Sequence, residues 1–180
     1  MKKRQLILYI AVSLDGYIAK PGDDLSFLDR VQKEGEDYGY MRFMQSVDTV
    51  IIGRRTYDWV VEKIGGYPGS GKTVYVISRT NRISSEGVHF YSGGLKDLIT
   101  ELKNQPGKDL FCDGGAEIVN LLLDEKLFDE LIISVVPVLT GDGIRLFRDG
   151  RPEQDLELVS AKSFDTGLVQ LHYRVMGKDR

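Results

Sequence analysis

The sequence predicts a mixed α/β fold, with a mostly parallel central sheet, helices on both faces and an antiparallel hairpin near the C-terminal end. Residues 6–12 and 131–139 are continuous apolar runs, which are typical of strands buried on both faces. Between these runs, strand patterns alternate with helix patterns. Residues 156–164 and 168–175 alternate apolar and polar side chains around Asp165-Thr166-Gly167, and this pattern predicts the closing hairpin.

The first strand, residues 6–12, is followed by a turn at Asp15-Gly16 and by a loop rich in Pro, Gly and Asp that ends at Asp24. Residues 25–45 carry apolar side chains at helical spacing, so we expect them to be mostly helical, with a break at Gly35. Asp24 directly precedes this segment and is a suitable N-cap residue.

The rest of the chain alternates between β-branched or aromatic runs and segments with helical periodicity. Strands are expected at residues 48–53, 73–78, 88–91, 109–113 and 131–139, and helices at residues 54–64, 95–103 and 116–124. No linker, repeat or low-complexity segment interrupts the pattern, so we expect a single domain that covers residues 1–180.

Composition excludes several classes of function. The net charge of −3 argues against a nucleic-acid partner held by a global positive field and favours small molecules. No apolar run reaches the roughly 20 residues of a membrane helix, and the apolar part of residues 1–12 is too short for a signal peptide, so we expect a cytoplasmic protein without a membrane partner. The single cysteine, Cys112, is expected to be a buried core thiol, and the two histidines share no metal-ligand spacing with it, so no metal is expected.

Residues 66–73 match the phosphate-loop pattern G-x-x-x-x-G-K-[ST] and end at Lys72-Thr73. A phosphate loop requires a strand before it and a helix after it, whereas this segment follows a helix pattern and precedes a strand pattern. We therefore interpret it as a crossover loop rather than a triphosphate site.

Small and basic residues follow three expected strands. Gly53-Arg54-Arg55-Thr56 and Asp113-Gly114-Gly115-Ala116 lie at strand-to-helix junctions, and Ser78-Arg79 follows the strand at residues 73–78. Ligands of open α/β sheets bind at the carboxyl ends of strands, where helix N-termini favour anions. Arg54 and Arg55 are also compatible with solvated positions at the start of a helix. The glycine pair is also compatible with a role in close packing of the helix against the strand. Together the three strand ends favour a phosphate-rich cofactor.

Five segments in order resemble the dihydrofolate reductase-like fold and, within it, the reductase domain of riboflavin biosynthesis in its stand-alone bacterial form. They are residues 12–19 (VSLDGYIA), 50–57 (VIIGRRTY), 76–79 (VISR), 113–116 (DGGA) and 128–147 (FDELIISVVPVLTGDGIRLF). The last segment is the most specific. The resemblance implies a three-layer fold and a reductase that uses NADPH.

The resemblance also implies cofactor contacts. Arg54 and Thr56 resemble residues that hold cofactor phosphates, Arg79 a contact to the 2′-phosphate, and Gly114 and Gly115 the pair over which the pyrophosphate passes. Residues expected at the nicotinamide are Ala11 and Ile18, and the strand-end segments add Gly53, Arg55, Ser78, Ala116 and Glu117.

The resemblance suggests Asp24 as the catalytic carboxylate and Ser134 as the hydroxyl beside it. Asp24 as a simple helix cap is an equally supported alternative, and Asp15 is a rival carboxylate. Folate reductases carry Pro-Gly-Arg-Lys at the crossover, where the arginine clamps the folate tail. Here Pro68-Gly69 is followed by Ser70-Gly71-Lys72, which argues against folate.

The sequence therefore predicts an NADPH-dependent reductase of a small heterocyclic or pyrimidine-type substrate, resembling 5-amino-6-(5-phosphoribosylamino)uracil reductase. The alternatives are a dihydrofolate or pterin reductase and a non-catalytic nucleotide-binding protein. Residues 131–139 and the closing hairpin offer a sheet edge that a second copy can cover, so we expect a homodimer.

Overall fold

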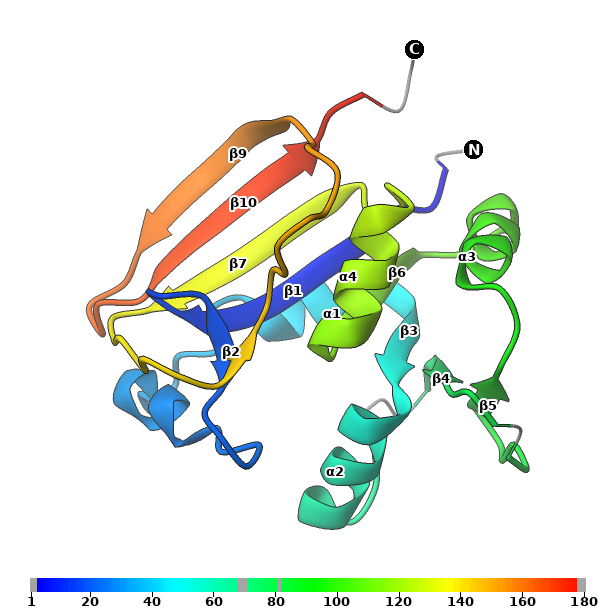
Figure 1. Ribbon diagram of the computed structural model, residues 1–180, viewed down its shortest axis with the longest axis horizontal. Coiled ribbons are helices and arrows are strands. Elements are labelled where there is room, and N and C mark those ends of the chain that lie inside the picture. The colour runs from blue at the N-terminus through cyan, green and yellow to red at the C-terminus, as the bar shows by residue number, and fades with distance from the viewer. Residues whose placement is uncertain (1–2, 68–70, 81, 178–180) are drawn as a thin grey trace.

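Eight strands form one sheet in the order β5-β4-β3-β6-β1-β7-β10-β9 in the computed structural model, which describes residues 3–67, 71–80 and 82–177 (Figure 1). In that order the strands are Val88–Tyr91, Thr73–Ile77, Val47–Gly53, Asp109–Gly114, Leu6–Ser13, Glu130–Val136, Val169–Val175 and Leu156–Ser163. The first six are parallel, and β10 pairs antiparallel with both β7 and β9. The predicted mixed sheet and closing hairpin are confirmed.

Helices cover both faces of the sheet. Helices α3 (Leu95–Asn104) and α4 (Ala116–Asp124) pack on one face, and α1 (Tyr40–Ser46) with the 3-10 helix η1 (Ser26–Val31) on the other, so that α4 lies in front of the sheet and α1 behind it in Figure 1. Helix α2 (Arg54–Ile64) follows β3 directly.

Alternation along β1 explains this division of the core. Leu6 and Leu8 pack with the residues of α3 and α4, whereas Ile7 and Tyr9 pack with Phe43 of α1. Every one of these β1 side chains is buried or half-buried, because successive side chains of a strand point to opposite faces and both faces are covered. The continuous apolar run at residues 6–12 thus predicted the central position of this strand.

The predicted helix at residues 25–45 is wrong in its extent. The structure has η1 and the short α1 in this region, with residues 32–39 outside any helix. Gly35 and Gly39 have φ angles of 76° and 86°, and Tyr38 has a φ of 57°, all in the left-handed region. The side chain of Asp37 accepts hydrogen bonds from the N–H groups of Gly39 and Met41, so a new helix begins there.

Two further differences concern strands. The run at residues 131–139 forms β7 only as far as Val136, because Pro137 has no N–H group and Val138 N turns back to bond to Val136 O at 2.8 Å. A small second sheet joins β2 (Tyr17–Ala19) to β8 (Ile144–Arg145), a two-residue strand that the sequence pattern did not indicate.

Candidate functional site

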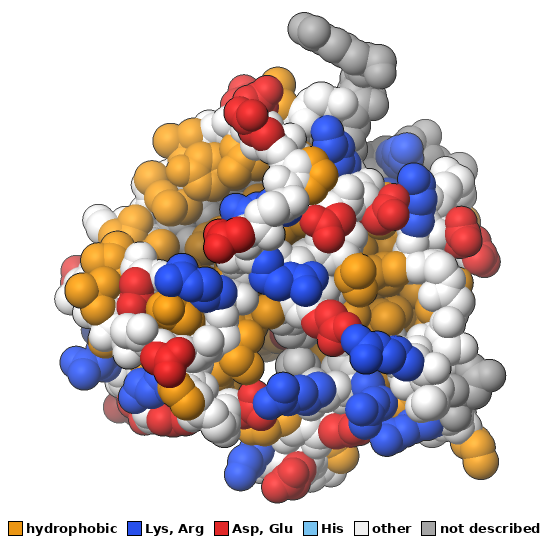
Figure 2. Space-filling view, in the orientation of Figure 1, with side chains coloured by type: hydrophobic (Ala, Val, Ile, Leu, Met, Phe, Trp, Pro, Cys, Tyr) orange, Lys and Arg blue, Asp and Glu red, His pale blue; other side chains and the backbone are white. Residues whose placement is uncertain are grey.

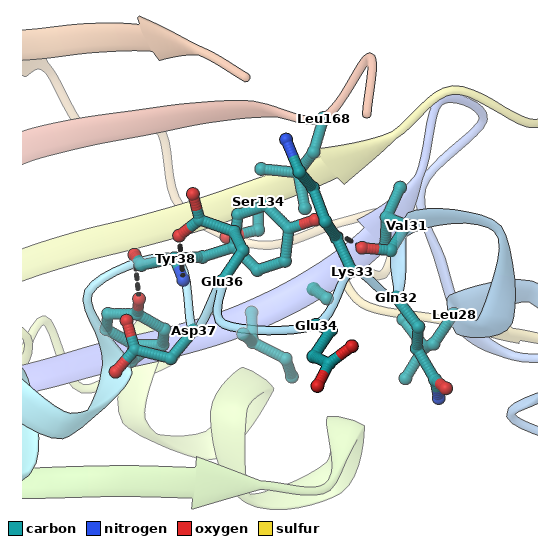
Figure 3. A pocket seen from close by; sticks show the side chains of 13 residues that line it. Leu28, Val31, Gln32, Lys33, Glu34, Glu36, Asp37, Tyr38, Ser134 and Leu168 are labelled. Carbon is teal, nitrogen blue, oxygen red and sulfur yellow. Dashed lines mark hydrogen bonds between the residues drawn. The ribbon is translucent and has the colours of Figure 1, made fainter. Parts of the chain in front are cut away.

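A cavity of about 610 Å³ opens on the face of the sheet that carries η1. Its floor comes from β1 and β7, which place Ala11 and Ser134 opposite each other as register partners. Segment 32–38 forms one wall, as Figure 3 shows. The lining residues are Tyr9, Ile10, Ala11, Leu28, Val31, Gln32, Lys33, Glu34, Glu36, Asp37, Tyr38, Ser134 and Leu168.

Four polar groups form a network at the floor. Gln170 on β10 is the cross-strand partner of Ser134, and its Nε2 donates to Ser134 Oγ at 3.1 Å, Tyr9 Oη at 3.0 Å and the carbonyl oxygen of Tyr38 at 3.2 Å. Tyr9 Oη in turn donates to Tyr38 O at 2.9 Å. Burial of the Tyr9 phenol raises its pKa, although the bond from Gln170 opposes this effect. Tyr9 is therefore a neutral hydrogen-bonding group at physiological pH.

Tyr38 anchors the wall of the cavity at two points. Its hydroxyl bonds to Thr166 Oγ1 at 3.0 Å and donates to the carbonyl oxygen of Val31, and its ring meets Phe164 edge-on with centroids 4.9 Å apart. The Tyr38 end of segment 32–38 is thus fastened both to η1 and to the turn of the β9–β10 hairpin.

Three carboxylates and one lysine stand at the rim. Glu36 accepts from the N–H of Tyr38 at 2.8 Å, and the pKa of Asp37 is lowered by the N–H groups it caps at the start of α1. Lys33 crosses the wall in Figure 3 and pairs with Asp165 at 3.2 Å. Glu34 is exposed at the same rim. These acidic positions were not singled out from the sequence, because they lie in the segment expected to be helical.

The predicted cofactor glycines meet at two adjacent strand ends. Helices α2 and α4 begin at the N-cap residues Gly53 and Gly115, neither of which supplies a side-chain cap. A Cβ atom on Gly115 would lie 2.9 Å from Thr56 Oγ1, and one on Gly53 would lie 3.6 Å from Gly115 N, so the two junctions are in close contact. Uncapped first-turn N–H groups on bare backbone suit the phosphates of a dinucleotide.

This edge lies next to the strand that forms part of the cavity floor. Strand β6, which ends at Gly114, pairs with β1, whose Tyr9 and Ala11 line the cavity. The peptide bond between Gly114 and Gly115 is cis. Ala116 and Glu117 form the first turn of α4, and Ser78, which is buried, follows β4 on the other side of β3. The predicted contacts on β4, β3 and β6 therefore line one edge of the sheet.

The predicted basic residues are exposed and each is paired with a carboxylate. Arg54 bonds to Asp58 at 3.0 Å, Arg55 to Asp23 at 2.6 Å, and Arg79 to Glu117. The ion pair between Arg79 and Glu117 connects the segment that follows β4 to the first turn of α4, and β3 lies between β4 and the strand that leads into α4. A bound phosphate has to compete with these carboxylates.

The two candidate carboxylates lie outside the cavity lining. Asp24, whose side chain is 48% exposed, accepts from the N–H and hydroxyl of Ser26 at 2.7 and 3.1 Å and lies 3.8 Å from Lys20 Nζ. Its pKa is lowered, chiefly by the N–H of Ser26. These contacts resemble those of a helix-start residue more than those of a substrate-binding group.

Asp15 ties two loops together. It accepts from Ser13 Oγ at 2.5 Å and from the N–H groups of Gly141 at 2.7 Å and Thr140 at 3.1 Å. The hydroxyl of Ser13, with smaller contributions from these N–H groups, lowers the pKa of Asp15 to about 2. Ile18 packs with the core cluster of α3 and α4, whereas Ala11 lies in the cavity.

The sequence marked Asp113 only as part of a strand-end segment, not as a buried acid. Asp113, at the end of β6, accepts a 2.5 Å hydrogen bond from Tyr67 Oη, and burial raises the pKa of both groups. The next residue towards the N-terminus, Cys112, is fully buried as predicted, and burial raises its pKa to about 12. No pattern in the sequence indicated that Tyr67 and Asp113 would meet.

The contacts of Lys72 explain the lysine of the phosphate-loop pattern. Its Nζ donates to the carbonyl oxygens of Met44 at 2.6 Å and Val47 at 2.9 Å, which end α1. A cation at a helix C-terminus is favourable because free carbonyl groups gather there. Residues 68–70 of the pattern lie outside the described residues.

Residues 4–170 match the RibD C-terminal domain. The chain belongs to the RibD C-terminal domain family. The uncharacterized protein YwjB of Bacillus subtilis (strain 168) is 42% identical over 172 residues, which cover 95% of this chain and 98% of YwjB. The riboflavin biosynthesis protein RibD of Haemophilus influenzae is 43% identical over 51 residues, which cover 28% of this chain and 14% of that protein.

Solved structures agree with this assignment. A Shewanella sp. PV-4 protein, provisionally named a riboflavin biosynthesis protein, is 32% identical with a TM-score of 0.87, and the match covers 96% of this chain and 99% of that chain. The Enterococcus faecalis dihydrofolate reductase complexed with NADP(H) has a TM-score of 0.67 at 17% identity, over 98% of this chain and 100% of that chain. The predicted dihydrofolate reductase-like fold is confirmed.

Within residues 3–67, 71–80 and 82–177, the helices are all too short or too polar to span a membrane. The same described residues bring together no cluster of three or more His, Cys, Asp or Glu side chains suited to a metal ion.

Proposed function

We propose that this protein is an NADPH-dependent reductase of a small heterocyclic, pyrimidine-type substrate, similar to the 5-amino-6-(5-phosphoribosylamino)uracil reductase named for a Thermotoga maritima relative of the same fold. The observation that carries the proposal is the pairing of β6, which ends at Gly114, with β1, which contributes Tyr9 and Ala11 to the cavity. In a member of the RibD C-terminal domain family, this pairing supports a substrate cavity next to a strand end suited to a dinucleotide.

The residues of the edge fit NADPH, which when bound supplies a hydride. The first-turn N–H groups after Gly53 and Gly115 would bind its phosphates, and the guanidinium groups of Arg54 and Arg79 would pair with terminal phosphate oxygens. Ala11 would face the nicotinamide, because it lines the floor of the cavity.

The residues of the cavity would bind and orient the heterocycle. Ser134, which is 5% exposed, offers a hydroxyl from the floor, and Leu28, Val31 and Leu168 offer apolar contacts. For Asp24, the family resemblance suggests proton delivery after hydride transfer, and this role requires its contacts with Ser26 to open.

Loss of NADPH absorbance in the presence of single heterocycles tests the proposal. The panel should contain a 5-amino-6-ribosylaminouracil phosphate, dihydrofolate and dihydropterin. We expect turnover with the pyrimidine, reduced in Ser134→Ala and unchanged in Ser160→Ala, which alters an exposed serine of β9. Preference for dihydrofolate or a pterin would favour the alternative reductase, and NADPH binding without any turnover would favour a nucleotide-binding protein.

A further inference from the structure

We propose that Gln170 fixes Ser134 as the hydrogen-bond donor of the cavity, so that the cavity selects heterocycles that present a carbonyl oxygen or an unprotonated ring nitrogen to β7. This inference deepens the proposed function and rests on it. Gln170 is not a lining residue itself, so it would act as a positioning residue through Ser134 and Tyr9.

The orientation of the Gln170 amide follows from its neighbours. The carbonyl oxygen of Tyr38 can only accept a hydrogen bond, and it lies 3.2 Å from Nε2, so the NH₂ group must face it. The same NH₂ group then faces Ser134 Oγ at 3.1 Å and Tyr9 Oη at 3.0 Å. Its two protons serve three oxygens, so one proton is shared, and because the amide nitrogen cannot accept, both hydroxyl oxygens act as acceptors towards it.

The two hydroxyl groups differ in what they have left to offer. Tyr9 donates its proton to Tyr38 O at 2.9 Å, so its donor is used within the protein. Ser134 accepts from Gln170, and within the part of the chain that the structure describes no acceptor is bonded to its own proton. Ser134 is buried to 5% exposure yet lines the cavity, so its O–H group is a donor held ready for a ligand.

This arrangement defines the chemistry of the ligand. A buried donor without a partner is costly, and a ligand acceptor placed against Ser134 removes that cost. A ring N–H at the same position could use the second lone pair of Ser134 Oγ, but it would leave the Ser134 proton unpaired. Ring carbonyl groups of a pyrimidine meet the requirement, as do unprotonated ring nitrogens.

Gln170→Glu tests the inference because it keeps the shape of the side chain and removes its donor. At pH 7 the new side chain of this variant, Q170E, is ionised and has two acceptor oxygens, so the Ser134 proton would turn to it and be lost to the ligand. When the pH falls, the new carboxyl group becomes protonated and can donate again. Gln170→Met removes the polar group at every pH. Gln154→Glu is the matched control, because Gln154 donates to Leu123 O at 3.0 Å, away from the cavity.

The measurement is calorimetric binding of the 5-amino-6-ribosylaminouracil phosphate to the NADP⁺ complex, which does not require turnover. Relative to the unmodified protein at the same pH, Q170E should bind roughly tenfold more weakly at pH 7, the scale of one hydrogen bond, and should recover as the pH falls to about 4.5. Gln170→Met should be weakened without recovery, and Gln154→Glu and the NADP⁺ affinities should be unchanged. Glu36, Asp37 and the ligand phosphate can also change charge over this pH range. Comparing each variant with the unmodified protein at the same pH cancels their effect on the measured affinity.

Three results would overturn the inference: unchanged binding in both Gln170 variants, equal weakening at both pH values together with a lower melting temperature, or no binding of the pyrimidine to the unmodified complex. The proposed function is judged separately by NADPH oxidation. If the protein oxidises NADPH and the Gln170 variants bind the pyrimidine normally, the proposed function stands and the inference about Gln170 fails. If Q170E recovers binding at low pH but the protein oxidises no NADPH, the inference stands and the proposed function fails.

Discussion

Arg79→Ala should weaken the binding of NADPH about tenfold and leave the binding of NADH nearly unchanged. A hydrogen bond between a guanidinium and a phosphate contributes about 1.5–3 kcal/mol, or roughly ten- to hundredfold in affinity. The Arg79 side chain is 88% exposed, so solvent screening places the expected effect at the lower end of that range. Glu117, which pairs with it, is 62% exposed and must release the guanidinium when the phosphate binds.

Glu117→Gln should have the opposite effect. It removes the carboxylate that competes for Arg79 and the negative charge that repels the phosphate, so NADPH should bind severalfold more tightly. High salt should reduce both effects, since exposed charges are screened.

Fluorescence titrations with NADPH and NADH measure both variants. Arg174→Ala is the matched control, because Arg174 is half exposed and paired with Glu157 at 2.9 Å on the β9–β10 hairpin, far from the predicted phosphate. Equal weakening of NADPH and NADH by Arg79→Ala, or no weakening of either, would place the 2′-phosphate elsewhere.

Four further predictions concern stability, catalysis and assembly. Lys72→Met should lower the free energy of unfolding in urea by about 1–3 kcal/mol without affecting any ATP hydrolysis, and magnesium-dependent hydrolysis lost in this variant would support a phosphate loop. Asp24→Asn keeps an acceptor for the helix start, so a capping role predicts turnover within about twofold, and a loss of roughly a hundredfold would assign acid–base chemistry to Asp24. The folded pKa of Asp15, about 2, lies below its ordinary value of 3.8, so its contribution to stability is complete above pH 4 and should be lost as the pH falls towards 2; a flat difference between Asp15→Asn and the unmodified protein over this window would contradict the linkage. Light scattering should show a dimer at micromolar concentration that Leu158→Lys dissociates, and a monomeric mass of the unmodified protein would count against pairing through β9.

The dimer prediction depends on β9, the exposed end of the sheet. The expectation that residues 131–139 form part of this edge is wrong, because β7 lies between β1 and β10. Every residue of β9 is exposed, and Figure 2 shows hydrophobic side chains gathered over the β9–β10 part of the molecule. Leu156 and Leu158 are 43% and 55% exposed on this edge strand. An edge strand with apolar side chains and free backbone groups favours pairing with another strand.

Strand ends were predictable because they depend on local composition. Gly53 and Gly114-Gly115 follow apolar strands, and parallel strands bring their carboxyl ends to one edge of a sheet. The residues of this edge are therefore recognisable in the sequence without knowledge of their neighbours in the sheet. The order of β3 and β6 in the sheet, which makes them adjacent, came only from the structure.

The wall of the cavity was not predictable in the same way. Tyr38 has a left-handed backbone, and it is held by Thr166 and by Gln170, which are more than 120 residues away in the chain. Helical spacing at residues 25–45 was a local signal that these long-range contacts override. The acidic rim belongs to the same segment and was missed for the same reason.

Gln170 shows what separates a sequence pattern from a site. In an alternating strand it reads as an ordinary polar position, and only the register of β10 against β7 puts it opposite Ser134. A one-residue shift of that register would turn Gln170 to the other face of the sheet and would leave Ser134 without its hydrogen-bond partner. Under the proposed function, the edge of the sheet would bind the cofactor through backbone groups that tolerate many side chains, whereas the floor of the cavity would depend on the facing pair Ser134 and Gln170. Substrate choice in this protein should therefore change with single substitutions on β7 and β10 that leave cofactor binding intact.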